Sequence, residues 1–115
     1  MYNNDLTNYE SITLTPATGV SIVSNSCYIH GTRVHIEFMC TLSSNKSQSD
    51  NLATIDKGYP INNITTGIYT SNISGANYAF SMGGYVSKTG DIRQRISSSI
   101  PSGSTVTLYI EYYIK

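Results

Sequence analysis

The residues best suited to chemistry lie close together between Tyr28 and Leu42, where two histidines accompany an arginine and a glutamate. His35 and Glu37 are two positions apart, so on a β-strand their side chains would share one face and could bind a metal ion. Such a site usually needs a third ligand, and no group of Asp, Glu, His or Cys elsewhere in the sequence supplies one by its spacing. We therefore expect a solvated or interfacial polar surface here, with no metal, no cofactor and no catalytic residue.

Sequence signatures of the common enzyme classes are not found. The chain has no G-x-S-x-G motif, no phosphate-binding loop, no dinucleotide fingerprint and no H-E-x-x-H motif. Asp91 and Glu37 give no reason to propose the paired carboxylates of a glycosidase. We expect that the protein is not an enzyme.

The segment that carries the histidines alternates between apolar and polar residues with the two-residue period of a half-buried strand. Its apolar positions are Val34, Ile36, Phe38, Cys40 and Leu42. A two-residue turn of Gly31 and Thr32 would join this strand to a preceding antiparallel strand, because glycine adopts positive φ readily. The hairpin then has one apolar face, and its polar face carries Tyr28, His30, Arg33, His35 and Glu37.

The same register separates the two cysteines of the chain. Cys27 would face Ile36, which places Cys40 about 13 Å further along the strand at the usual rise per residue. A disulfide needs Cα atoms within about 7 Å of each other. We expect two buried free thiols, which suits assembly in a reducing cytoplasm.

The whole sequence predicts an all-β fold in a single domain. Ser, Thr, Asn and Gly are abundant among its 115 residues, and about eight to ten short alternating runs are separated by turn signals. We predict an antiparallel β-sandwich, jelly-roll-like, over residues 11–115, with residues 1–10 as a linker or lead-in segment. Periodicity leaves a jelly roll, another Greek key and a closed barrel open as topologies.

Turn residues predict where the strands end. Ser24–Ser26 should turn the chain between a short strand at Val20–Ile22 and the hairpin, and Gly83-Gly84 should end the strand that begins at Tyr78. Residues 43–51 lack any apolar side chain and should form an exposed loop. Lys88–Asp91 should be the loop of a second hairpin, and residues 105–114 alternate as a long final strand.

Charge and hydropathy argue against two classes of partner. The seven basic and seven acidic side chains cancel, so the chain lacks the basic excess with which proteins bind nucleic acid. No apolar run approaches the length that spans a bilayer. We expect neither nucleic-acid binding nor membrane insertion.

The chain has ten tyrosines and no tryptophan, and these tyrosines are its main candidates for contact with a ligand. A tyrosine presents a flat apolar ring with a hydrogen-bonding tip, which suits contact with sugars or proteins. We predict ligand contacts for the four tyrosines at or near loops, namely Tyr59, Tyr69, Tyr78 and Tyr85. Tyr109 and Tyr113 share the outward side of the final strand, and with the polar face of the hairpin they predict a subunit interface.

Several motifs resemble those of one protein family. The segment Tyr28–Ile36, Y-I-H-G-T-R-V-H-I, is similar to the aromatic residue, turn glycine and alternating strand that open the C-terminal head domains of bacteriophage tail-fibre and baseplate receptor-binding proteins. Leu52–Pro60 resembles a turn of these domains, Ser87–Ile92 resembles their late glycine hairpin, and an aromatic final strand is also usual. The resemblance implies a β-sandwich head in the virion, at the distal end of a phage or prophage tail fibre or baseplate, that forms a homotrimer and binds a host cell-surface saccharide.

Other functions of such a domain stay open. A structural module could trimerise or cap a fibre without any ligand, and a lectin-like module could bind carbohydrate as a monomer. A glycan-processing enzyme is the weakest alternative, because it lacks candidate residues. A stable oligomer would exclude the monomeric lectin, and glycan binding would exclude the purely structural module.

Overall fold

The computed structural model describes residues 9–72, 75–97 and 99–114, with the side chains of residues 72 and 75–79 left aside. These ranges contain nine β-strands and no helix, so the predicted all-β class is confirmed. The strands are β1 (Tyr9–Ser11), β2 (Leu14–Pro16), β3 (Val20–His30), β4 (Arg33–Leu42), β5 (Asn51–Ile55), β6 (Ile64–Asn72), β7 (Gly75–Val86), β8 (Asp91–Gln94) and β9 (Ser104–Tyr113). Within the described ranges there is accordingly no helical segment of the length and hydropathy that a membrane span requires.

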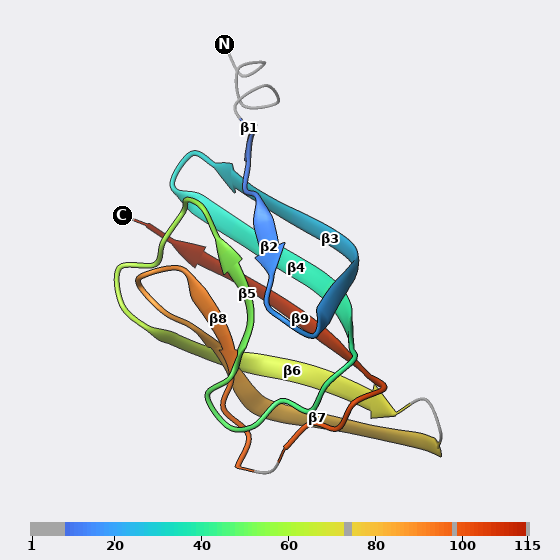
Figure 1. Cartoon of the computed structure of the whole chain (residues 1–115). Coiled ribbons are helices and arrows are strands. Elements are labelled where there is room, and N and C mark those ends of the chain that lie inside the picture. The colour runs from blue at the N-terminus through green and yellow to red at the C-terminus, as the bar shows by residue number, and fades with distance from the viewer. Residues whose placement is uncertain (1–8, 73–74, 98, 115) are drawn as a thin grey trace.

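All nine strands belong to one antiparallel sheet in the order β1-β3-β4-β9-β6-β7-β8-β5-β2. β1 and β2 stand at opposite ends of this order, yet only Ile12 and Thr13 separate them in the chain, so the sheet curls until its edges approach. The backbone N–H of Ile12 donates to the carbonyl of Cys27 in β3 at 3.0 Å. Figure 1 shows the result, with β2 and β5 in front of β4 and β9. The division into two packed sheets of a jelly roll stays a prediction.

The β3–β4 hairpin has the predicted register. Gly31, with a φ of +67°, lies at the turn, and Tyr28 pairs with His35. Both cysteines are buried and free. The core of the curled sheet contains the whole apolar side of β4 together with that of β9, which are Val34, Ile36, Phe38, Cys40, Leu42, Val106, Leu108, Ile110 and Tyr112.

Two predicted strand ends are wrong, beginning with the turn at Ser24–Ser26. β3 runs without interruption from Val20 to His30, and its pairing with β4 shifts by one residue between Ile22 and Ser24. Val23 is the extra residue of this β-bulge and is 58% exposed. The polar run stays in the strand because its backbone is paired along β4, which outweighs the turn preference of serine and asparagine.

Gly83-Gly84 also fails to end a strand, because β7 continues to Val86. The register between β6 and β7 shifts nearby, between Thr66 and Ile68. A Cβ atom on Gly84 would lie 2.7 Å from Ile68 Cγ2 and 3.1 Å from the carbonyl oxygen of Thr66. The glycine therefore marks a close approach of two strands at a bulge.

The late hairpin and the final strand both form, each one residue earlier than predicted from the sequence, with the hairpin loop at residues 87–90 and the strand at Ser104–Tyr113. Val86 pairs with Ile92, with residues 87–90 between β7 and β8. β9 pairs with β4 on one side and β6 on the other, so the last strand lies in the middle of the sheet. The hydroxyl of Tyr112 in β9 donates to the carbonyl of Gly58 at 2.7 Å and fixes the loop after β5 against the core.

Candidate functional site

The predicted interface residues come together on the outer side of the sheet. Pairing among β3, β4 and β9 aligns their outward side chains in rows of Tyr28, His35 and Glu111, of His30, Arg33 and Tyr113, and of Glu37 and Tyr109. β1 extends the surface, because Tyr9 pairs with His30. We call the surface formed by these nine residues the tyrosine face.

His35 is the centre of the tyrosine face and is only 9% exposed, although it lies on the outward side of β4. Its Nδ1 is 2.9 Å from Glu111 Oε2, and its Nε2 is 3.1 Å from Glu37 Oε1. The ring stacks on Tyr28 with centroids 4.7 Å apart and meets Tyr109 edge to face at 5.0 Å. With a carboxylate at each ring nitrogen, only the protonated imidazole can donate to both.

Contacts within the tyrosine face shift the pKa values of Glu111 and Tyr109. The hydrogen bond with His35 lowers the pKa of Glu111, the hydrogen bond from Tyr109 and the charge of Arg33 add to this, and partial desolvation opposes it. Desolvation raises the pKa of Tyr109, and the negative charge of Glu111 adds to the rise. The face therefore holds a compact network of aromatic rings around His35 and the two carboxylates in contact with its ring nitrogens.

Sequence reasoning missed two members of this face. Glu111 has the same outward parity as Tyr109 and Tyr113, which was the signal available for it. Tyr9 stacks on His30 with centroids 4.3 Å apart and meets Tyr28 edge to face at 5.0 Å. Its place depends on β1 joining the sheet edge, which no local pattern of the short polar segment indicates.

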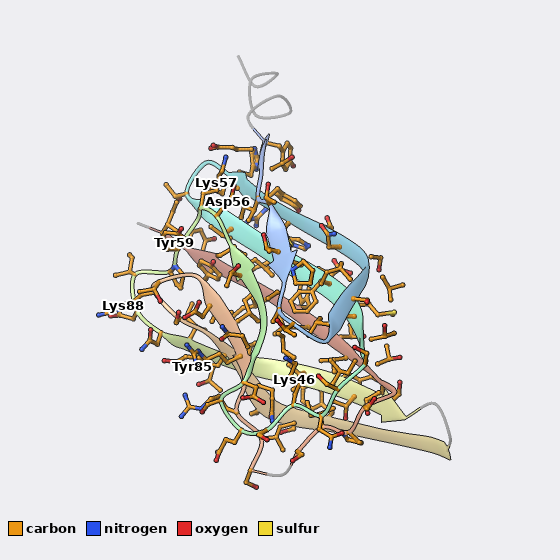
Figure 2. The ribbon with its side chains drawn as sticks, in the orientation of Figure 1. Lys46, Asp56, Lys57, Tyr59, Tyr85 and Lys88 are labelled. Atoms are coloured by element: carbon orange, nitrogen blue, oxygen red, sulfur yellow. The ribbon has the colours of Figure 1, made fainter. Side chains whose placement is uncertain are left out.

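The four tyrosines predicted to contact ligand do not form one cluster. Tyr69 in β6 pairs with Phe80 in β7 and with Thr107 in β9, so it lies on the outer side of the sheet on the strand next to the tyrosine face. Tyr59 and Tyr85 lie elsewhere, on the side of the molecule that also carries Lys88 (Figure 2). The side chain of Tyr78 falls outside the described residues.

Tyr85 lines a hollow of about 410 Å³ that is rich in basic side chains. The Arg95 guanidinium lies 4.8 Å from the centroid of the Tyr85 ring. Arg93 donates to Asp91 Oδ2 and to the carbonyl of Ser49, each at 3.0 Å. We call this the basic hollow, and its lining residues are Ser49, Asn63, Tyr85, Ser87, Lys88, Thr89, Asp91, Arg93 and Arg95.

The basic hollow combines an aromatic ring with an excess of positive charge. Three basic side chains line it against the single carboxylate of Asp91. Tyr59 is 45% exposed and lies beside the same loop, since a Cβ atom on Gly90 would be 2.8 Å from Tyr59 Cε1. Two of the predicted ligand tyrosines therefore border one loop, residues 87–90, from different elements.

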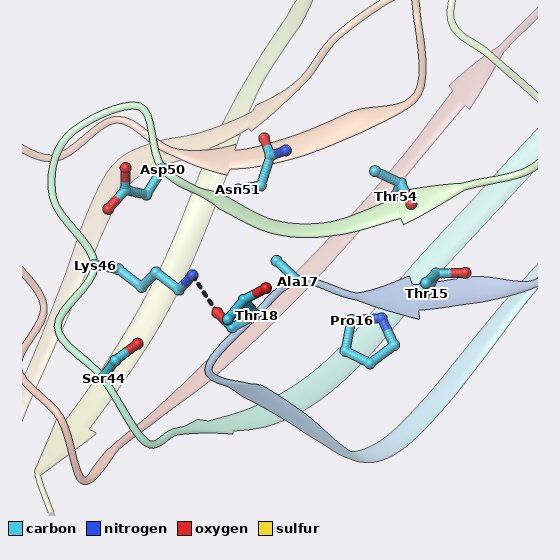
Figure 3. A pocket seen from close by; sticks show the side chains of 9 residues that line it. All are labelled: Thr15, Pro16, Ala17, Thr18, Ser44, Lys46, Asp50, Asn51 and Thr54. Carbon is cyan, nitrogen blue, oxygen red and sulfur yellow. Dashed lines mark hydrogen bonds between the residues drawn. The ribbon is translucent and has the colours of Figure 1, made fainter.

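A second hollow, of about 620 Å³, was not predicted from the sequence and is shown in Figure 3. Lys46 reaches into it from the loop between β4 and β5, and its Nζ donates to the carbonyl of Thr18 at 2.7 Å. We call it the polar hollow, and its lining residues are Thr15, Pro16, Ala17, Thr18, Ser44, Lys46, Asp50, Asn51 and Thr54. The loop itself is largely exposed, as expected, but Lys46 at its centre is only 7% exposed.

Metal chemistry finds no support in this part of the chain. No three His, Cys, Asp or Glu side chains among the described residues are arranged to hold a metal ion. The ring nitrogens of His35 are occupied by Glu37 and Glu111. The surfaces are instead suited to binding through aromatic rings, hydroxyl groups and charge.

Comparisons with known proteins point to one fold. No protein-family model matches the sequence, and no curated protein matches it significantly. Among solved structures, the chain is similar to the head domain of phage bIL170, a crystal structure presented with the question of a common fold for the receptor-binding domains of lactococcal phages. The match has 12% sequence identity and a TM-score of 0.59, and it covers 93% of this chain and 97% of that chain. The resemblance inferred from the sequence is thus confirmed at the level of structure, and the chain has the fold of a phage receptor-binding head domain.

Proposed function

We propose that the chain is the receptor-binding head of a phage or prophage tail fibre or baseplate, that it trimerises, and that it binds a saccharide on the host cell surface. The observation that carries the proposal is the shared fold with the bIL170 head domain over 93% of the chain. Residues 11–115 would form the head and residues 1–10 the lead-in to it, with Tyr9 and Glu10 joining the sheet of the head through β1. Assembly in the bacterial cytoplasm accords with the two free thiols.

The tyrosine face is the proposed contact between protomers. Tyr9, Tyr109 and Tyr113 are 50%, 52% and 63% exposed, which leaves large aromatic surfaces in contact with water. Aromatic residues and arginine are enriched at protein interfaces, and this face also contributes Arg33. Burial of these rings against neighbouring copies would remove the largest group of exposed tyrosines in the described part of the chain from solvent.

Saccharide binding is proposed for the four predicted tyrosines. Tyr85, which lines the basic hollow, and Tyr59, beside the 87–90 loop, are the leading pair, and Tyr69 and Tyr78 are further contacts. Sugar rings present apolar faces that stack on tyrosine, while their hydroxyl groups bond polar side chains. The three basic side chains favour a saccharide that carries acidic groups. Single-site affinity would be weak, and a trimer would raise it by multivalency.

Adsorption of the purified domain to host cells tests the proposal. The variant with alanine at Tyr59, Tyr69, Tyr78 and Tyr85 should lose adsorption while remaining an oligomer of unchanged mass. Val23→Ala removes an exposed apolar side chain that borders neither hollow and should adsorb normally. Undiminished adsorption of the tyrosine variant would place the receptor contact on other residues. No adsorption even by the unaltered oligomer would favour the structural module.

A further inference from the structure

Lys46 is a largely buried basic side chain that lines the polar hollow. Its ammonium donates to the carbonyl of Thr18 and makes no ion pair within the described residues. An ammonium group has three hydrogens, so two remain for other acceptors. These hydrogens can bond to acceptors, from water or from a ligand, that enter the polar hollow.

The backbone around Lys46 is fixed rather than loose. Its N–H donates to the carbonyl of Ile100, and its carbonyl accepts from the N–H of Ile100, both at 2.9 Å. The same carbonyl accepts from Nε2 of Gln94 at 2.9 Å, and Gln94 is fully buried. The ammonium is therefore held in the polar hollow before any ligand arrives.

The acceptor of Lys46 is fixed in the same way. Thr18 lies in the turn Ala17–Val20, where the N–H of Val20 donates to the carbonyl of Ala17 at 3.0 Å. Gly19 has a φ of +80°, as the third residue of a type II turn requires. Donor and acceptor thus come from two loops that the fold brings together.

The rest of the polar hollow offers acceptors and hydroxyl groups. Asn51 Oδ1 is buried and has no hydrogen-bond partner among the described residues. Thr15 and Thr54 pair across β2 and β5, so their side chains lie on one face. Asp50 accepts from the N–H of Ser47 at 2.7 Å through one carboxylate oxygen, and it is the only acidic residue of the lining.

We propose that the polar hollow binds a neutral sugar ring through its hydroxyl groups, as a second saccharide site separate from the basic hollow. This inference rests on the proposed function of the domain. One ammonium and one carboxylate balance the charge of the lining, so no net charge is demanded of the ligand. Sugar hydroxyl groups both donate and accept, which matches a lining that presents both kinds of group. The volume falls within the range of about 300 to 1,000 Å³ for small-molecule sites.

Heteronuclear NMR of the whole domain tests the proposal, with methyl α-glucoside, methyl α-galactoside and N-acetylglucosamine as neutral probes and glucuronic acid as the acidic one. At least one neutral probe should shift the amide signals of Thr18, Lys46, Asn51 and Thr54, with a dissociation constant on the order of millimolar. Glucuronic acid should instead shift signals around the basic hollow. Neutral probes that leave the four amides unmoved would overturn the inference.

Two variants check the assignment. Thr54→Val keeps the shape of the side chain and removes one hydroxyl group, so affinity for the neutral probe should fall about fivefold to tenfold. Lys46→Met should weaken it at least as much, and Thr54→Val decides alone if the methionine variant does not fold. Thr105→Val, on β9 away from both hollows, is the matched control and should bind normally. Unchanged affinity of Thr54→Val would contradict the proposal.

Failure of this inference and of the proposed function can be told apart. Neutral probes that shift only amides of residues 88–95 would overturn the polar hollow as a saccharide site and leave the receptor-binding role intact. Shifts at the polar hollow in a domain that does not adsorb to host cells would support the site and count against the proposed function.

Discussion

Phe38 is the largest fully buried side chain in the described part of the chain. The Phe38→Ala variant should lose about 3 to 5 kcal/mol of unfolding free energy, because the substitution removes buried apolar surface and leaves a cavity. Urea unfolding measures the difference. Phe80→Ala is the matched control, since Phe80 is 70% exposed and its removal should cost far less. A loss below about 1 kcal/mol for Phe38→Ala would contradict its place in the core.

The two thiols should be unreactive in the folded protein. Burial raises the pKa of Cys40 to about 11 and also raises the pKa of Cys27. Since the thiolate is the reactive form, iodoacetamide should modify neither residue before unfolding and both afterwards. Mass spectrometry of alkylated, unreduced protein measures this. A disulfide between the two would contradict the hairpin register.

Pairing of β4 with β9 brings His35 next to Glu111. We expect this contact to make the unfolding free energy depend on pH in the acidic range. The pKa of folded Glu111 lies below the ordinary value of 4.5, chiefly through the hydrogen bond with His35. Unfolding therefore takes up a proton at acidic pH. The contribution of the pair is complete above about pH 4.5 and is lost as the pH falls through the folded pKa.

The Glu111→Gln variant should lose this acid-dependent part of the unfolding free energy. Urea unfolding at about pH 6.5 and about pH 3.5 compares the variant with the unaltered chain. Their stabilities should differ at the higher pH, and the difference should be smaller at the lower one. Glu10→Gln removes a carboxylate from an exposed ion pair with Lys57 and controls for net charge. Equal pH dependence of Glu111→Gln and the unaltered chain would rule the pair out as a stabilising contact.

At the scale of strands, the sequence predicts features that depend on the local alternation of apolar and polar residues. It does not predict features that depend on contacts between segments far apart in the chain. The β3–β4 hairpin follows from strict alternation and one glycine turn, so its register was predictable. The bulge at Val23 depends on the partner strand, and the burial of Lys46 depends on Ile100 and Gln94. Such contacts join residues far apart in sequence, which a local pattern does not contain.

The candidate sites likewise contain some residues that local patterns predict and others that depend on the whole sheet. Outward parity of the hairpin and the last strand predicted most of the tyrosine face, because cross-strand neighbours share a side. Tyr69 and Tyr85 looked alike in sequence as loop-proximal tyrosines, yet strand order separates them. Tyr69 lies beside β9 and Tyr85 beside β8, so only the complete sheet tells which surface each one joins.

At the scale of the whole molecule, strand order separates the proposed contacts. The tyrosine face occupies β1, β3, β4 and β9, which form one end of the order. The basic hollow draws on β7 and β8, and the polar hollow on β2 and β5, which form the other end. Because the sheet curls between them, subunits that meet through the tyrosine face would leave both hollows open to a receptor.

This separation predicts that assembly and binding respond to different substitutions. Light scattering at micromolar concentration should report three times the chain mass of 12.6 kDa. Tyr109→Ala combined with Tyr113→Ala should shift the protein toward monomer, because it removes two exposed rings from the proposed interface. Tyr85→Ala, which alters a ring of the basic hollow, should leave the mass unchanged. A clean monomer of the unaltered chain, or a trimer indifferent to the double substitution, would exclude the tyrosine face as the subunit contact.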